Sequence, residues 1–168
     1  AGDITSNQLN SMATLIREFS SEGKARTGFV QNVALRYVHE DDLVKLYSKL
    51  LETGLAKSGG LTMSTPVGCS GTTSCNLALT NSHRLAKEIQ RKFLELKLDE
   101  DDDLTDSSIK ISGCPNSCAQ HGIATIGFFG GGGRLGKDMY PNYQMSLGGR
   151  FDADTTLGQT CLRVPAKR

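Results

Sequence analysis

The sequence contains no tryptophan, no long apolar run and no marked excess of either charge. Nineteen basic residues stand against 18 acidic residues, so the net charge is only +1. Nucleic-acid-binding proteins usually carry a clear basic excess, and a membrane-spanning helix needs ~20 consecutive, mostly apolar residues. We therefore expect neither nucleic acid nor a membrane as a partner of this protein.

A secretory type of apolar segment is also missing from the start of the chain, so we expect a cytoplasmic protein whose thiols stay reduced. The length of 168 residues suits one domain, or a small domain with an appendage. A chain of this size buries roughly 70% of its unfolded surface, so it does not need metal or disulfides merely to fold. Glycine, by contrast, is abundant, and its 19 residues predict tight turns and close backbone approaches.

Four of the five cysteines fall in two tight pairs, Cys69-x5-Cys75 and Cys114-x3-Cys118. Thiolates are soft ligands, and four of them are the usual complement of an iron–sulfur cluster. Glycines and a proline flank both pairs and predict loops that wrap around a metal centre. The spacing therefore favours one [4Fe-4S] site, although it differs from the patterns of simple electron-carrier ferredoxins.

Two other interpretations of the cysteines stay open on spacing alone. Structural zinc sites usually separate paired ligands by two to four residues, which the second pair satisfies and the first does not. Buried or redox-active thiols are the other alternative, while disulfides are not favoured in a reducing compartment. Cys161 stands apart from the pairs, and we expect it to be a small buried hydrophobic residue.

Hydrophobic periodicity predicts a helix–strand–helix unit in the first third of the chain. Thr5 and Gln8 form a capping-box pattern at the start of the first helix. Residues 26–38 alternate like a single strand, and a second helix is expected from about residue 41 up to Gly54. A further short strand is expected near residues 61–65.

The remainder of the chain predicts helices and strands around the cysteines. Cys75 is expected to open a long helix that ends near residue 96, before a solvated acidic run at 99–103. Strands are expected at 109–111, 123–129 and 143–147. The four glycines at 130–133 are expected to form the turn of a hairpin.

These residues together resemble the siroheme-dependent nitrite and sulfite reductases. The resemblance rests on the two cysteine pairs, on Asn76-Leu77-Ala78 after the first pair and on Ile126-Gly127-Phe128 after the second. The segment Arg26-Thr27-Gly28-Phe29-Val30-Gln31-Asn32 is similar to a motif of the ferredoxin-like half-module that precedes the cluster domain in that family. The similarity extends over essentially the whole chain.

The resemblance implies a fold class and a domain organisation. The fold is expected to be α+β, with α/β-like character: a ferredoxin-like half-module over residues 1–60, followed by a mixed-sheet domain over 61–168 that binds [4Fe-4S] and siroheme and is truncated at its C-terminus. Family members have two related halves, and Val30 stands where the first half carries an arginine. The chain is therefore expected to be the second, C-terminal half, a fragment that is inactive alone.

The same resemblance implies a function, its cofactors and its partners. Cys69, Cys75, Cys114 and Cys118 would hold the [4Fe-4S] cluster, with Cys118 also bridging to the siroheme iron. Gln31, Asn32 and Arg26 would contact siroheme, and no catalytic residue is assigned. The expected partners are the missing N-terminal half of the enzyme, an electron donor (a ferredoxin or a flavoprotein), and nitrite or sulfite, which is reduced by six electrons. The alternatives are a [4Fe-4S] electron-transfer or structural module without siroheme, and a zinc-bound or metal-free domain.

Overall fold

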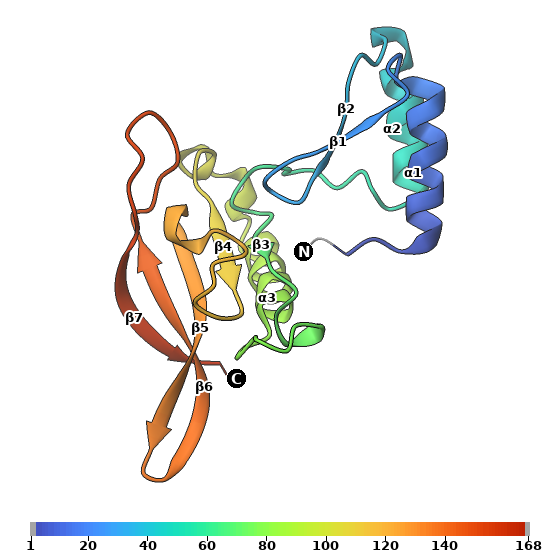
Figure 1. Cartoon of the computed structure of the whole chain (residues 1–168). Coiled ribbons are helices and arrows are strands. Elements are labelled where there is room, and N and C mark those ends of the chain that lie inside the picture. The colour runs from blue at the N-terminus through green and yellow to red at the C-terminus, as the bar shows by residue number, and fades with distance from the viewer. Residues whose placement is uncertain (1–2, 167–168) are drawn as a thin grey trace. The chain divides into compact units, whose positions relative to one another are not determined.

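The computed structural model describes residues 3–166 and divides them into two units, residues 3–60 and residues 61–166 (Figure 1). The sequence-based ranges 1–60 and 61–168 also include residues 1–2 and 167–168, which lie outside the described residues. Helices and a mixed sheet are both present, so the predicted α+β class is confirmed. Among residues 3–166, no helix is both long and apolar enough to cross a membrane.

Two helices form the frame of the first unit. Helix α1 (Ser6–Phe19) begins at the predicted capping box, in which the Gln8 amide donates to Thr5 Oγ1 at 3.2 Å and the Thr5 amide donates to Gln8 Oε1 at 3.1 Å. Helix α2 (Leu43–Glu52) ends where Gly54 takes φ +70°, as expected of a helix-terminating glycine. Buried Leu15 and Phe19 of α1 meet Leu46 of α2 in a small apolar core.

The single strand predicted over residues 26–38 is wrong. The structure instead has two short antiparallel strands, β1 (Ala25–Thr27) and β2 (Val33–Leu35). The chain reverses between them, where the Gly28 amide donates to the Asn32 carbonyl at 3.0 Å and Gln31 takes φ +61°. A residue in the left-handed region cannot continue an extended strand, so the apolar alternation in this segment was misleading.

The second unit is built on a five-stranded sheet whose order is β3-β4-β5-β6-β7. The first three strands run parallel and the last two are antiparallel to their neighbours. The strands are β3 (Val67–Gly68), β4 (Ile109–Ser112), β5 (Ile126–Leu135), β6 (Asp138–Leu147) and β7 (Gln159–Pro165). Strand β7 was not predicted, and the short strand expected at 61–65 is instead a turn, in which the Thr65 amide donates to the Thr62 carbonyl at 3.1 Å.

Helix α3 (Ser82–Glu95) covers the apolar face of strand β4. Ala86 and Phe93 of the helix share the buried core with Ile109 and Ile111 of the strand. The prediction that Cys75 opens this helix is wrong, because the helix begins seven residues later, where Asn81 Oδ1 accepts from the Arg84 amide at 2.9 Å. Cys75 therefore lies in a loop, away from the helix start.

The four glycines at 130–133 were predicted to form a turn, and this prediction is also wrong. They lie within β5, and the reversal comes later, at Gly136 with φ +64°. A side chain at Gly133 would collide with the ring of Tyr140, and one at Gly130 would collide with the carbonyl of Gly113. Glycine is needed here because other parts of the unit approach the strand backbone closely.

Candidate functional site

The first cysteine loop (residues 69–81) joins strand β3 to helix α3 and carries the first cysteine pair. Its fold depends on Gly71, which has φ +55° and accepts the Cys75 amide at 3.0 Å. The Thr72 amide then donates to the carbonyl of Thr80 at 3.1 Å, which closes the loop on itself. Cys69 and Cys75 therefore lie on one tight loop rather than along a helix.

The second cysteine loop (residues 113–121) follows strand β4 and carries the second pair. Ser117 and Gln120 both take φ +59°, and the Gln120 amide donates to the Ser117 carbonyl at 2.7 Å. Residues other than glycine rarely adopt left-handed backbone angles. Tertiary contacts must therefore hold this loop in place. It turns the chain around Cys118 before strand β5 begins.

The two loops meet at Gly113. Its carbonyl accepts the amides of Leu79 at 2.8 Å and Thr80 at 3.1 Å, and its amide donates to Cys69 Sγ at 3.1 Å. A Cβ at Gly113 would lie 2.9 Å from the Cα of Gly71, so the close approach of the two loops requires glycine at residue 113. Residues 44 positions apart in the chain are thereby brought into direct contact.

All five cysteines are free thiols in the structure. Cys114 is buried and Cys69 is half-buried, whereas Cys75 and Cys118 are exposed. Cys161 is also exposed, so the expectation that it is a buried hydrophobic residue is wrong. Its place on β7, whose residues are all exposed, explains the difference.

The structure does not bring the cysteines into a site for a single ion. Within residues 3–166, there is no group of three or more His, Cys, Asp or Glu side chains placed to hold one metal ion. A cluster makes a different demand, because its four thiolates bind the outer corners of a cube rather than one atom. The donor set and the contact of the two loops at Gly113 fit a cluster, and the assignment of its four ligands stays a prediction.

Ser82 lies against the half-buried sulfur of Cys69, and Tyr143 is near enough to interact with Cys69 electrostatically. Ser82 Oγ lies 3.2 Å from Cys69 Sγ and donates to the Cys69 carbonyl at 2.8 Å. Tyr143 is buried on β6, and this burial raises the pKa of its phenol. The surroundings of the Cys69 sulfur are therefore polar and largely shielded from water.

Polar side chains of strand β4 hold the second cysteine loop. Because side chains alternate along a strand, Lys110 and Ser112 face away from the α3 core. Lys110 Nζ donates to Gln120 Oε1 at 3.1 Å, and Ser112 Oγ lies 3.0 Å from His121 Nδ1. Burial lowers the pKa of both Lys110 and His121, because it disfavours their charged forms.

The three residues expected to contact siroheme lie in the first unit. Asn32 and Gln31 occupy the turn between β1 and β2, and Arg26 lies on exposed β1. Arg26 pairs with Glu22, and this hydrogen bond holds the pKa of the Glu22 carboxyl below its usual range. The structure therefore places these residues close together on one hairpin, while their contact with siroheme stays a prediction.

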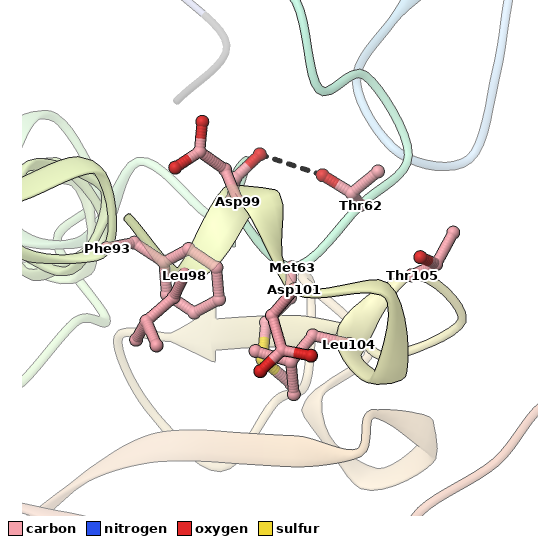
Figure 2. A pocket seen from close by; sticks show the side chains of 9 residues that line it. Thr62, Met63, Phe93, Leu98, Asp99, Asp101, Leu104 and Thr105 are labelled. Atoms are coloured by element: carbon pink, nitrogen blue, oxygen red, sulfur yellow. Dashed lines mark hydrogen bonds between the residues drawn. The ribbon is translucent and has the colours of Figure 1, made fainter. Parts of the chain in front are cut away.

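A small pocket in the second unit is separate from the cysteine loops. It lies between α3 and the turns η3 (Leu98–Glu100) and η4 (Asp102–Leu104), and its volume is about 30 Å³ (Figure 2). Phe93 and Met63 contribute apolar lining. Residues 99–103 are exposed, as predicted for a solvated acidic run. The pocket has room for about one water molecule and is not a cofactor site.

Ser82, Lys110 and Ser112 were not predicted to belong to the site. Strand β4 was predicted, and its alternation of isoleucine with lysine and serine was a signal that its second face is polar. The role of Ser82 had no comparable signal, because its contact with Cys69 depends on how the first cysteine loop folds.

Comparison with known proteins relates both units to one group of enzymes. Residues 1–53 match the family model described as the nitrite/sulfite reductase ferredoxin-like half domain. The chain is 30% identical over 161 residues to a ferredoxin–nitrite reductase of Synechococcus elongatus, and 29% identical over 159 residues to a sulfite reductase [NADPH] hemoprotein beta-component of Bacillus subtilis. These alignments cover 96% and 90% of the chain.

Solved structures agree with these relatives. The NirA protein of Mycobacterium tuberculosis matches 99% of the chain with a TM-score of 0.80 at 25% identity. A dissimilatory sulfite reductase I matches the fold with a TM-score of 0.71 at 12% identity. The chain spans only 30% of the Synechococcus relative, 26% of the Bacillus relative and 31% of NirA. The predicted resemblance to a part of the nitrite and sulfite reductases is confirmed.

Proposed function

We propose that this chain is the cofactor-holding, C-terminal part of a nitrite or sulfite reductase, and that the four paired cysteines bind a [4Fe-4S] cluster next to siroheme. The observation that carries the proposal is the contact of the two cysteine loops at Gly113. Its amide and carbonyl join a half-buried cysteine sulfur to the backbone of the other loop. The similarity to reductases along most of the chain supports the same conclusion.

The residues of the chain would hold the cluster and shield it. Cys69 and Cys114 are the more buried ligands, while Cys75 and Cys118 lie at the surface of the unit. The Gly113 amide orients the Cys69 sulfur, and Lys110 and Ser112 position the loop that carries Cys118. When bound, the cluster and siroheme supply the electron transfer that reduces nitrite or sulfite by six electrons.

Other roles come from the resemblance and are part of the same proposal. Cys118 would bridge the cluster to the siroheme iron, and Gln31, Asn32 and Arg26 would contact siroheme. The remaining half of the enzyme would complete the active site, with a ferredoxin or a flavoprotein as the electron donor. Such chemistry suits the cytoplasm, where thiols stay reduced.

A second candidate is a [4Fe-4S] module without siroheme. It is favoured by one observation, namely that all four paired cysteines belong to residues 61–166, so the cluster ligands need no residue of the first unit. A zinc-bound or metal-free domain is the third candidate, and elemental analysis separates it from the first two.

Anaerobic reconstitution of the full chain with iron and sulfide, with and without siroheme, tests the proposal. We expect broad visible absorption from the cluster, sharp visible bands when siroheme binds, and four iron atoms per chain apart from the siroheme iron. Cys114→Ser is expected to lose the cluster, whereas Cys161→Ser, which changes an exposed cysteine outside the pairs, is expected to keep it. A colourless protein containing zinc would instead support the third candidate.

Cys118→Ser tests the bridging role separately. The variant is expected to lose both the cluster and siroheme, because the bridge joins them. Retention of siroheme by this variant would contradict the bridging assignment. The result for Cys114→Ser would still test whether the paired cysteines bind the cluster.

A further inference from the structure

Ser82 occupies a special position next to the first cysteine pair. It is the first residue of helix α3, and its side chain is fully buried. Its hydroxyl oxygen lies 3.2 Å from Cys69 Sγ, and the Gly113 amide donates to the same sulfur at 3.1 Å. The sulfur therefore faces one backbone donor and one side-chain hydroxyl.

The packing around Ser82 keeps this hydroxyl in place. A Cβ at Gly71 would collide with Ser82 Oγ, and a Cβ at Gly68 would lie 3.2 Å from the Ser82 carbonyl. Ala86, one turn further along α3, is also buried and closes the same side. The hydroxyl is consequently not accessible to solvent, and its polar contacts are with the carbonyl and the sulfur of Cys69.

We propose that Ser82 is a positioning residue whose hydroxyl donates a hydrogen bond to the Cys69 sulfur and thereby raises the reduction potential of the cluster. This inference rests on the proposed function. A metal-bound cysteine is a thiolate and carries no proton, so in the contact between Ser82 and Cys69 the hydroxyl must be the donor. In the structure the hydroxyl donates to the Cys69 carbonyl at 2.8 Å, and because its oxygen already lies 3.2 Å from the sulfur, turning the hydroxyl hydrogen would redirect the bond to the thiolate.

The direction of the effect follows from charge. Reduction adds an electron to the cluster and its thiolates, and a donor aimed at sulfur stabilises that added negative charge. Since Ser82 is fully buried, water does not replace its hydroxyl as a donor when the hydroxyl is removed. Ser82→Ala therefore makes the cluster harder to reduce.

Redox titration of the reconstituted full chain with dithionite, followed by electron paramagnetic resonance, tests this inference. We expect Ser82→Ala to hold the cluster and to lower the ratio of reduced to oxidised cluster at least about threefold at a fixed potential, a shift of ~28 mV for one electron. Ser146→Ala is the matched control, because Ser146 is also a buried serine whose hydroxyl donates to a backbone carbonyl, that of Gly127. The control is expected to leave the potential unchanged.

The outcomes separate the two proposals. A cluster that forms in the wild type and has the same potential in Ser82→Ala, or an equal shift in Ser146→Ala, overturns the role of Ser82 alone. Failure of the wild-type chain to form a cluster overturns the proposed function and this inference together. If Ser82→Ala loses the cluster, Ser82→Thr decides, since it keeps the hydroxyl: restored loading at the wild-type potential supports the inference, and any other result overturns it.

Discussion

The first cysteine loop is held mainly by backbone groups at close-packed glycines, whereas the second is held mainly by side chains of strand β4. Gly71 of the first loop approaches Gly113 of the second loop closely, and a Cβ on either glycine would meet a neighbouring residue. In the second loop, Lys110 and Ser112 reach across to Gln120 and His121. The first loop is therefore sensitive to added volume, while the second is sensitive to lost polarity and to pH.

The largest expected effect is at Gly71. Gly71→Ala combines strain at φ +55° with a collision against Ser82, so it is expected to lower the free energy of unfolding by about 2–5 kcal/mol. Gly136→Ala has a similar φ of +64° but open space around the new Cβ, and it is expected to cost about 1–2 kcal/mol. Urea denaturation followed by circular dichroism measures both, and equal losses would show that packing against Ser82 is unimportant.

The next effect is at Gly130, which supports the first loop from strand β5. Gly130→Ala places a Cβ against the Gly113 carbonyl and is expected to cost about 1–3 kcal/mol of unfolding free energy. At Gly132, the new Cβ meets only the flexible end of Met139, so Gly132→Ala is expected to be within about 0.5 kcal/mol of wild type. A comparable loss in both variants, measured by the same urea denaturation, would contradict the close approach at Gly130.

Lys110 holds the second loop, and a smaller effect is expected there. Its pKa is lowered by burial, so the unfolded chain binds the proton more tightly than the folded chain, and stability rises with pH up to the ordinary lysine value near about 10.4. Lys110→Met is expected to lose this rise and to lie within about 1 kcal/mol of wild type at pH 7, because relief of the buried charge offsets the lost bond to Gln120. Urea denaturation at pH 7 and pH 9.5 in a reductant measures the difference, with exposed Lys87→Met as the control.

His121 gives the smallest expected effect, in the acid range. Burial lowers its pKa, so the stability it contributes as a neutral ring is present above the ordinary value near about 6.5 and is lost as pH falls below it. His121→Gln is expected to flatten this decline, by less than about 1 kcal/mol between pH 7.5 and pH 5.5. The exposed residue His39 offers a control as His39→Asn, which keeps a capping side chain at the same position. An unchanged decline in the His121 variant would mean that another group causes the loss of stability at low pH.

Local patterns predicted the helices better than the strands. The capping box at Thr5 and the glycine at residue 54 mark helix ends through local chemistry, and both predictions were confirmed. The hairpin at residues 25–35, the start of α3 and the glycine-rich strand were mispredicted. For the glycine-rich strand the deciding contact is distant in the sequence, because the Gly113 carbonyl packs against Gly130. The hairpin and the start of α3 depend on nearby residues, through the Gly28–Asn32 turn and the Asn81 cap, which apolar periodicity does not reveal.

Sequence patterns alone predict the α+β class, the two close cysteine pairs and the likeness to reductases, because periodicity, spacing and motifs are properties of neighbouring residues. No local pattern predicts that the Gly113 amide reaches the Cys69 sulfur, that Ser82 lies beside it, or that Lys110 reaches Gln120. The physical reason is that these contacts join residues 10 to 44 positions apart. They exist only after the parallel strands β3, β4 and β5 have been set side by side.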